Sequence, residues 1–185
     1  LAYQNAGNLD KALPLLEESL ELSREILGDN HPGTLISMQN LGLAYQDSGK
    51  LDKALPLLEE TLKMRRQILG TNHPDTINTI RNLGLVYKDA GNLIKAQPLL
   101  EELLKLTTMV HGAKHPDTLS SMNNLGRTYR LGKRLDKALP LLKETLTLRQ
   151  EVLGANHPDT LKSMNNLGLA YQNAGNLDKA LPLLE

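Results

Sequence analysis

Histidine is the residue type in this chain with the widest chemical reach, because imidazole can bind a metal or transfer a proton. Four His-Pro pairs recur at a fixed interval (73 − 31 = 42): they begin at His31, His73, His115 and His157. Equivalent residues of successive repeats lie too far apart to share one metal ion, whose ligands lie about 2 Å away. We therefore expect each histidine to pack or hydrogen-bond within its own loop. His111 lies near His115, but no third ligand is evident, so we expect no metal site.

Tyrosine follows the same interval, and the chain has no Phe or Trp. The five tyrosines are Tyr3, Tyr45, Tyr87, Tyr129 and Tyr171. Regularly spaced aromatic side chains can stack on the bases of a nucleic acid. Each tyrosine, however, shares a helical face with leucine and glycine. We expect these side chains to fill the space between paired helices.

Motifs for catalysis or cofactor binding are absent from the sequence. The chain has no cysteine, nucleophile elbow, phosphate loop or H-E-x-x-H motif, so we expect no enzyme activity and no cofactor. The acidic pairs Glu59-Glu60 and Glu101-Glu102 are interpreted as surface charges. The absence of cysteine fits a reducing compartment, and we expect a cytoplasmic location.

The balance of charge and hydropathy narrows the range of partners. The sequence contains 21 basic and 21 acidic residues, so no net field attracts nucleic acid or an anionic membrane. No apolar run approaches the roughly 18 residues that span a bilayer. We therefore expect neither nucleic acid nor a membrane as a partner.

The fixed period predicts a solenoid of stacked repeats. The sequence of residues 1–17 returns unchanged at 169–185. We place the repeats at 1–27, 28–69, 70–111, 112–153 and 154–185. First helices are expected at 34–48, 76–90, 118–132 and 160–174, and second helices at 9–27, 51–69, 93–111 and 135–153.

The turn between the two helices of a repeat differs in one place. Gly49, Gly91 and Gly175 lie four residues after a tyrosine, whereas Lys133 occupies this position and follows Gly132. A left-handed lysine costs about 1–2 kcal/mol. We therefore expect this first helix to end one residue early, at Gly132.

The pattern Leu83-Gly84-x-x-Tyr87-x-x-x-Gly91-x-x-x-x-Ala96-x-x-x-Leu100 resembles the tetratricopeptide repeat. The HPDT loop and the run Asn124-Leu125-Gly126 are similar to the 42-residue variety of kinesin light chains. The resemblance implies an all-α, right-handed superhelical solenoid of antiparallel helix pairs. It also implies that the first helices line a concave, peptide-binding groove.

A helical wheel of each first helix places polar, basic and leucine side chains opposite the core-facing residues. The repeated asparagines either form an amide ladder between neighbouring helices or contact the backbone of a bound peptide. Residues 112–153 carry eight basic and four acidic side chains, a local charge of 8 − 4 = +4. The predicted peptide-binding residues are Gln39, Asn40, Leu43, Gln46, Arg81, Asn82, Leu85, Lys88, Asn123, Asn124, Arg127, Arg130, Asn165, Asn166 and Leu169.

These features predict a protein-interaction scaffold that binds an extended, acidic peptide segment in the groove. Two alternatives stay open: a purely structural or oligomerisation arm, and the sensor region of a larger signalling protein. Both ends of the chain fall inside a repeat. We expect the end residues Leu1, Tyr3, Leu177, Ala180 and Leu184 to face water or to mediate head-to-tail self-association.

Overall fold

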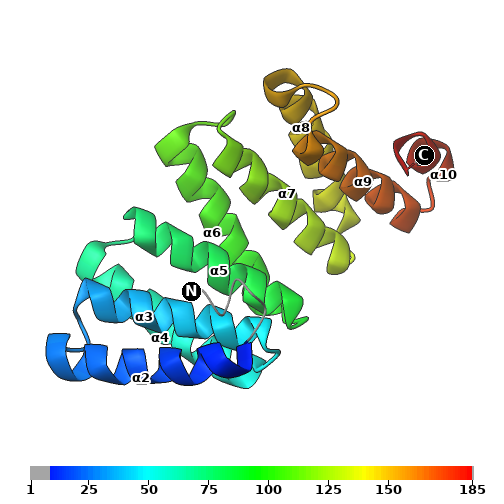
Figure 1. Cartoon of the computed structure of the whole chain (residues 1–185). Coiled ribbons are helices and arrows are strands. Elements are labelled where there is room, and N and C mark those ends of the chain that lie inside the picture. The colour runs from blue at the N-terminus through cyan, green and yellow to red at the C-terminus, as the bar shows by residue number, and fades with distance from the viewer. Residues whose placement is uncertain (1–8, 185) are drawn as a thin grey trace. The chain divides into compact units, whose positions relative to one another are not determined.

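The computed structural model describes residues 9–184, and this part of the chain consists of α-helices joined by short turns (Figure 1). The all-α prediction is confirmed. The second helices of the repeats are α2 (Leu9–Leu27), α4 (Leu51–Leu69), α6 (Leu93–His111), α8 (Leu135–Leu153) and the shorter α10 (Leu177–Leu184). The first helices are α3 (Pro32–Asp47), α5 (Pro74–Asp89), α7 (Pro116–Leu131) and α9 (Pro158–Asn173).

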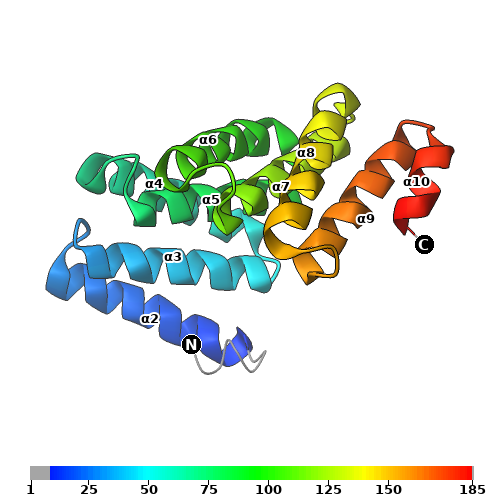
Figure 2. The same cartoon turned by 90° about the horizontal axis from the view of Figure 1, so that it is seen from above.

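The chain divides into two compact units, with the boundary between Gly91 and Asn92. In the first unit, α2 packs on α3, α3 on α4 and α4 on α5, and α3 also contacts α5. The second unit repeats this arrangement from α6 to α10, with α7 in contact with α9 (Figure 2). Within each unit, therefore, consecutive first helices lie side by side.

Each second helix from α2 to α8 has the bounds that the sequence predicts. Each also contains a proline, such as Pro56 at the sixth position of α4, and the helix continues past it. Proline removes one backbone donor from the helix and disturbs the preceding turn. Because it lies close to the helix start, only a short first turn is affected.

The first helices begin two residues before the predicted positions and end one residue before them. The reason is the residue that caps each helix: His73 takes an extended backbone conformation and its side chain accepts a hydrogen bond from the backbone N–H of Asp75. Pro74 then occupies the first helical position, where a missing N–H costs nothing.

The predicted early end of the helix at Gly132 is wrong. The helix ends at Leu131, Gly132 has a negative φ, and Lys133 takes the left-handed conformation with φ 58°. The N–H of Arg134 donates to the carbonyl of Tyr129 at 2.8 Å, as happens in the turn after α3. This hydrogen bond and the packing of α8 on α7 keep the common turn despite the conformational cost to lysine.

Small and aromatic residues fill the contact between the two helices of a repeat. A Cβ atom placed on Gly126 would lie 2.6 Å from a methyl carbon of Leu142, which is fully buried. Tyr45, Tyr87 and Tyr129 are buried beside this contact, and their predicted role in packing is confirmed. The two other tyrosines differ: Tyr171 is half-buried, and Tyr3 lies outside the described residues.

Two buried arginines connect three helices each, which the sequence did not predict. The guanidinium of Arg149 in α8 donates to the backbone carbonyl of Asp159 at 2.7 Å and to Ser163 Oγ at 2.9 Å, both in α9. It also reaches Ser120 Oγ of α7 at 3.4 Å. Arg65 makes the corresponding contacts in the first unit.

The end residues only partly follow the prediction. Leu177 and Leu184 are exposed, whereas Ala180 is buried, so the expectation for Ala180 is wrong. Leu1 and Tyr3 lie outside the described residues. Within residues 9–184, none of the helices has the length and apolarity that crossing a bilayer requires.

Candidate functional site

A polar depression of about 420 Å³ lies between α7 and α9 in the second unit. The helices that form it are neighbours because α8 packs against both. Seven of its eight lining residues are predicted peptide-binding residues, and the eighth is Lys162. The lining consists of Asn123, Asn124, Arg127, Arg130, Lys162, Asn165, Asn166 and Leu169.

One asparagine pair within the lining of this depression connects the two helices. Asn166 of α9 donates from Nδ2 to Asn123 Oδ1 of α7 at 3.0 Å. This pair accounts for one rung of the amide ladder that the sequence suggested. Asn124 and Asn165 also line the depression, and their amides can donate and accept at the same time.

The charge of the depression is positive. Arg127 and Arg130 lie nearly one turn apart on α7, and no acidic side chain is part of the lining. Burial, and then the nearby Arg127 guanidinium, lower the pKa of Arg130. The Nε of Arg130 is buried and has no hydrogen-bond partner among the described residues. Lys162 is partly neutralised, because it pairs with Asp159 at 3.1 Å.

The predicted residues of the first unit are more engaged within the protein. Gln39 accepts hydrogen bonds from Arg65 and Thr79. Lys88 was expected on the open face but is buried, and its ammonium lies 3.1 Å from the carboxylate of Asp89. A helical wheel gives only the direction of each side chain, so the prediction for Lys88 took no account of the Asp89 carboxylate. The remaining predicted residues of this unit are partly buried: Asn40, Leu43, Gln46, Arg81, Asn82 and Leu85.

The glutamates of the second helices have a role that the sequence reading missed. Tyr129 donates its hydroxyl hydrogen to Glu101 Oε1 at 2.6 Å, and Tyr87 makes the same bond to Glu59. Both glutamates lie on the surface, as expected, but each also accepts a hydrogen bond from a buried tyrosine. Burial first, and then the hydrogen bond to Glu101, raise the pKa of Tyr129. The separation of 28 residues, which recurs in each pair, is a signal that could have identified them.

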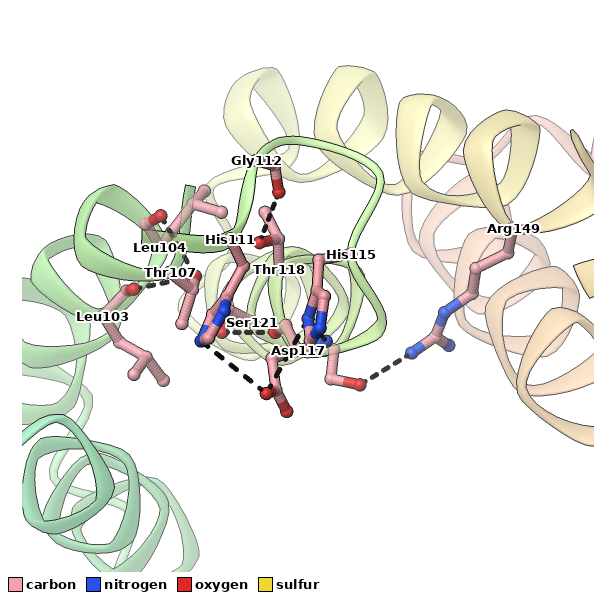
Figure 3. Close-up of polar contacts among 11 residues, drawn as sticks. Leu103, Leu104, Thr107, His111, Gly112, His115, Asp117, Thr118, Ser121 and Arg149 are labelled. Atoms are coloured by element: carbon pink, nitrogen blue, oxygen red, sulfur yellow. Dashed lines mark hydrogen bonds and ion pairs between the residues drawn. The ribbon is translucent and has the colours of Figure 1, made fainter. Parts of the chain in front are cut away.

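The histidines of the loops act as predicted, within their own loops. The Nδ1 atom of each accepts a backbone N–H two residues later, as in His115 with Asp117 at 3.1 Å. His111 lies against His115, with ring centroids 4.4 Å apart. Asp117 completes a group of three potential metal ligands, so the inference that a third ligand is lacking was wrong (Figure 3).

Comparison with known proteins agrees with this architecture. The family model described as the tetratricopeptide repeat matches residues 1–67, 40–106, 75–151 and 132–185, which together cover the chain. A search of curated proteins gives no match.

Several solved structures share the fold. One is a candidate kinesin light chain from Podosopora anserina with nearly identical TPR-like repeats; it is 30% identical, with a TM-score of 0.90 over 99% of this chain and 87% of that one. BtubC (BKLC) from P. vanneervenii is 24% identical, with a TM-score of 0.84 over 98% of this chain and 72% of its own. MamA from Desulfovibrio magneticus RS-1 is 18% identical, with a TM-score of 0.72 over 98% and 85% of the two chains.

The repeat length, the helix pairs and the glycine contact between paired helices agree with the match of the family model over the whole sequence. Two of the solved structures with the same fold are kinesin-light-chain-like proteins. The chain belongs to the tetratricopeptide repeat family, whose members are generally non-catalytic scaffolds for protein–protein interaction.

Proposed function

We propose that the depression between α7 and α9 binds an extended peptide segment that carries acidic side chains. The observation that supports this most strongly is the state of Arg130. Its positive charge is repelled by the positive charge of Arg127, and no acidic side chain lines the depression to compensate for either. A carboxylate at this surface would supply the compensating charge, and it matches the planar guanidinium group.

The other lining residues suit the rest of such a peptide. An extended backbone offers one donor and one acceptor per residue, which the side-chain amides of Asn124 and Asn165 can satisfy. Leu169 offers an apolar contact at the same surface. In this arrangement the amides hold the peptide backbone, while Arg127 and Arg130 select acidic side chains.

The test is a binding titration with a labelled peptide rich in Glu and Asp. We expect Arg127→Glu combined with Arg130→Glu to weaken binding by at least about tenfold, since a hydrogen bond to a charged group contributes roughly 1.5–3 kcal/mol. Added salt should also weaken binding to the unmodified protein, because part of the attraction is screened beyond about 8 Å.

Two controls separate this site from general charge effects. Lys105→Glu with Lys143→Glu makes the same change of net charge on exposed positions of α6 and α8, and it should leave affinity within about twofold. A peptide with Gln in place of Glu and Asn in place of Asp should bind weakly to all variants. Equal affinities for the two double variants would contradict the proposal.

A second candidate function, self-association, is favoured by an apolar stripe on α2. Leu15, Leu22 and Ile26 are 53%, 47% and 73% exposed, respectively. An apolar stripe of this kind on one helix face suits contact with another protein surface. Light scattering over a range of concentrations tests the idea: Leu22→Glu with Ile26→Glu should abolish any growth of apparent mass. A mass that stays monomeric in the unmodified protein would contradict it.

A further inference from the structure

The turn that joins α6 to α7 brings together two imidazoles and one carboxylate (Figure 3). His111 is the last residue of α6, His115 caps α7, and Asp117 lies in the first turn of α7. Asp117 Oδ2 lies 4.0 Å from His111 Nε2 and 3.8 Å from His115 Nδ1. One potential ligand atom from each residue falls within 4.8 Å of the other two.

This combination occurs at one junction between repeats. Residues equivalent to His115 occur in the neighbouring repeats, and Asp75 and Asp159 correspond to Asp117. The position of His111 is different, because it holds leucine in the other repeats: Leu27, Leu69 and Leu153. Within residues 9–184, no second group of this kind occurs. Compared with the turns that contain Asp75 and Asp159, the ligand set of this turn therefore gains one member through a change from leucine to histidine.

We propose that His111, His115 and Asp117 bind a zinc ion. Imidazole nitrogen and carboxylate oxygen are ligands that Zn²⁺ accepts readily, whereas Mg²⁺ and Ca²⁺ prefer oxygen ligands alone. Three protein ligands leave one position of a tetrahedral site for water. The side chains are 36%, 42% and 45% exposed for His111, His115 and Asp117, so an ion and its water can reach them.

The three side chains must rotate to close around the ion. Zinc bonds to nitrogen and oxygen of about 2.0–2.2 Å place neighbouring tetrahedral ligand atoms roughly 3.4 Å apart. The two measured separations exceed this value by about half an ångström. The imidazole rings are stacked at an interplanar angle of 19°, so they must tilt to bring their nitrogens toward a common ion.

Two features of the turn limit the affinity. His115 Nδ1 accepts the N–H of Asp117 at 3.1 Å, and coordination through this nitrogen gives up the cap of α7. A cation is also unfavourable at a helix N-terminus, although the Asp117 carboxylate compensates for this charge. Lys114 in the same turn pairs with Glu151. We therefore expect binding weaker than that of four-ligand structural zinc sites.

A bound zinc ion would connect the end of α6 directly to the start of α7. Because it binds only the folded arrangement of the three ligands, zinc should raise the unfolding temperature of the protein, and the rise should grow with the logarithm of the zinc concentration once this exceeds Kd. The proposal is thus a structural zinc site in a turn, and it is independent of peptide binding at the depression between α7 and α9.

Calorimetric titration with Zn²⁺ after removal of bound metal tests the site on three proteins. The unmodified chain should bind one ion, and His111→Leu, which restores the residue of the neighbouring repeats, should lower affinity by at least about tenfold. Leu69→His should add a second site, because His73 Nδ1 lies 3.8 Å from Asp75 Oδ2, the same separation as in the proposed site.

The comparison of the unmodified protein with His111→Leu shows whether zinc binds at the proposed site. Zinc should raise the unfolding temperature of the unmodified protein and leave that of His111→Leu nearly unchanged. Far-UV circular dichroism of both proteins without zinc checks that the substitution preserves the helices. Equal zinc affinity of the two proteins, or no binding by the unmodified chain, would overturn the proposal.

Discussion

Replacing Tyr129 with phenylalanine tests how much the hydrogen bonds between tyrosine and glutamate stabilise the contact between neighbouring repeats. The substitution keeps the buried ring and removes only the hydroxyl, which donates to Glu101 Oε1 at 2.6 Å. Lys137 lies 5.3 Å from the centre of the Tyr129 ring and can keep this contact. The change in stability therefore reports mainly on the hydrogen bond.

The expected loss follows from the charge and exposure of the acceptor. A hydrogen bond to a charged group contributes roughly 1.5–3 kcal/mol. The Glu101 side chain is 46% exposed, so water can replace the lost donor. We therefore expect Tyr129→Phe to reduce the free energy of unfolding by about 1–2 kcal/mol, a factor of roughly 5–30 in the unfolding equilibrium.

The chain contains its own control for this experiment. For Tyr171 in the last repeat, the residue 28 positions earlier is Lys143 and not a glutamate, so Tyr171 cannot form the corresponding bond. Urea unfolding followed by far-UV circular dichroism should give a loss below about 0.5 kcal/mol for Tyr171→Phe. A double-mutant cycle with Glu101→Gln isolates the pair. Equal losses at the two tyrosines, or no coupling in the cycle, would refute the reasoning.

Three further predictions concern stability. Arg149→Ala should cost about 2–4 kcal/mol in urea unfolding because it removes the donor from acceptors of α7 and α9, of which the Ser163 hydroxyl is buried, whereas Lys143→Ala on the exposed face of α8 should cost under about 0.5 kcal/mol. Burial, and then the bond to Glu17, raise the pKa of Tyr45 to about 12, above the unfolded value of about 10. The stabilisation of the folded protein by the protonated Tyr45 hydroxyl should be complete below about pH 10 and lost as pH rises toward about 12. Unfolding measured across this range with no such loss would contradict this prediction. Lys133→Gly should stabilise the protein by about 1 kcal/mol in thermal unfolding, because φ is 58° there, while Gly175→Ala should destabilise it by a similar amount.

The helices that the sequence located best are those whose limits depend on apolar periodicity and glycine. The second helices match residue for residue, since leucine recurs through them and a glycine such as Gly70 follows. The first helices start earlier than predicted, because histidine caps them. Histidine is not among the residues that usually cap a helix, so loop composition alone did not identify it.

In the candidate site, too, the sequence located the residues that recur on a helix face and missed those whose position depends on a single local contact. The helical wheel found the asparagines and arginines around the depression, because they recur on one helix face. It failed for Lys88, whose charge is paired with the adjacent Asp89. The spacing of the histidines did not identify Asp117 as a neighbour of His111, because the meeting of these residues depends on the path of the turn between two helices.

Side-chain amide resonances offer the most direct test of the proposed peptide site. An acidic peptide should be titrated into the isotope-labelled protein while the NH₂ groups of Asn124 and Asn165 and the guanidinium of Arg130 are followed by NMR. The proposed function predicts that these signals shift together and saturate at one peptide per chain, with little change at Asn92, which caps α6. Saturable binding that leaves all three signals unchanged would contradict it.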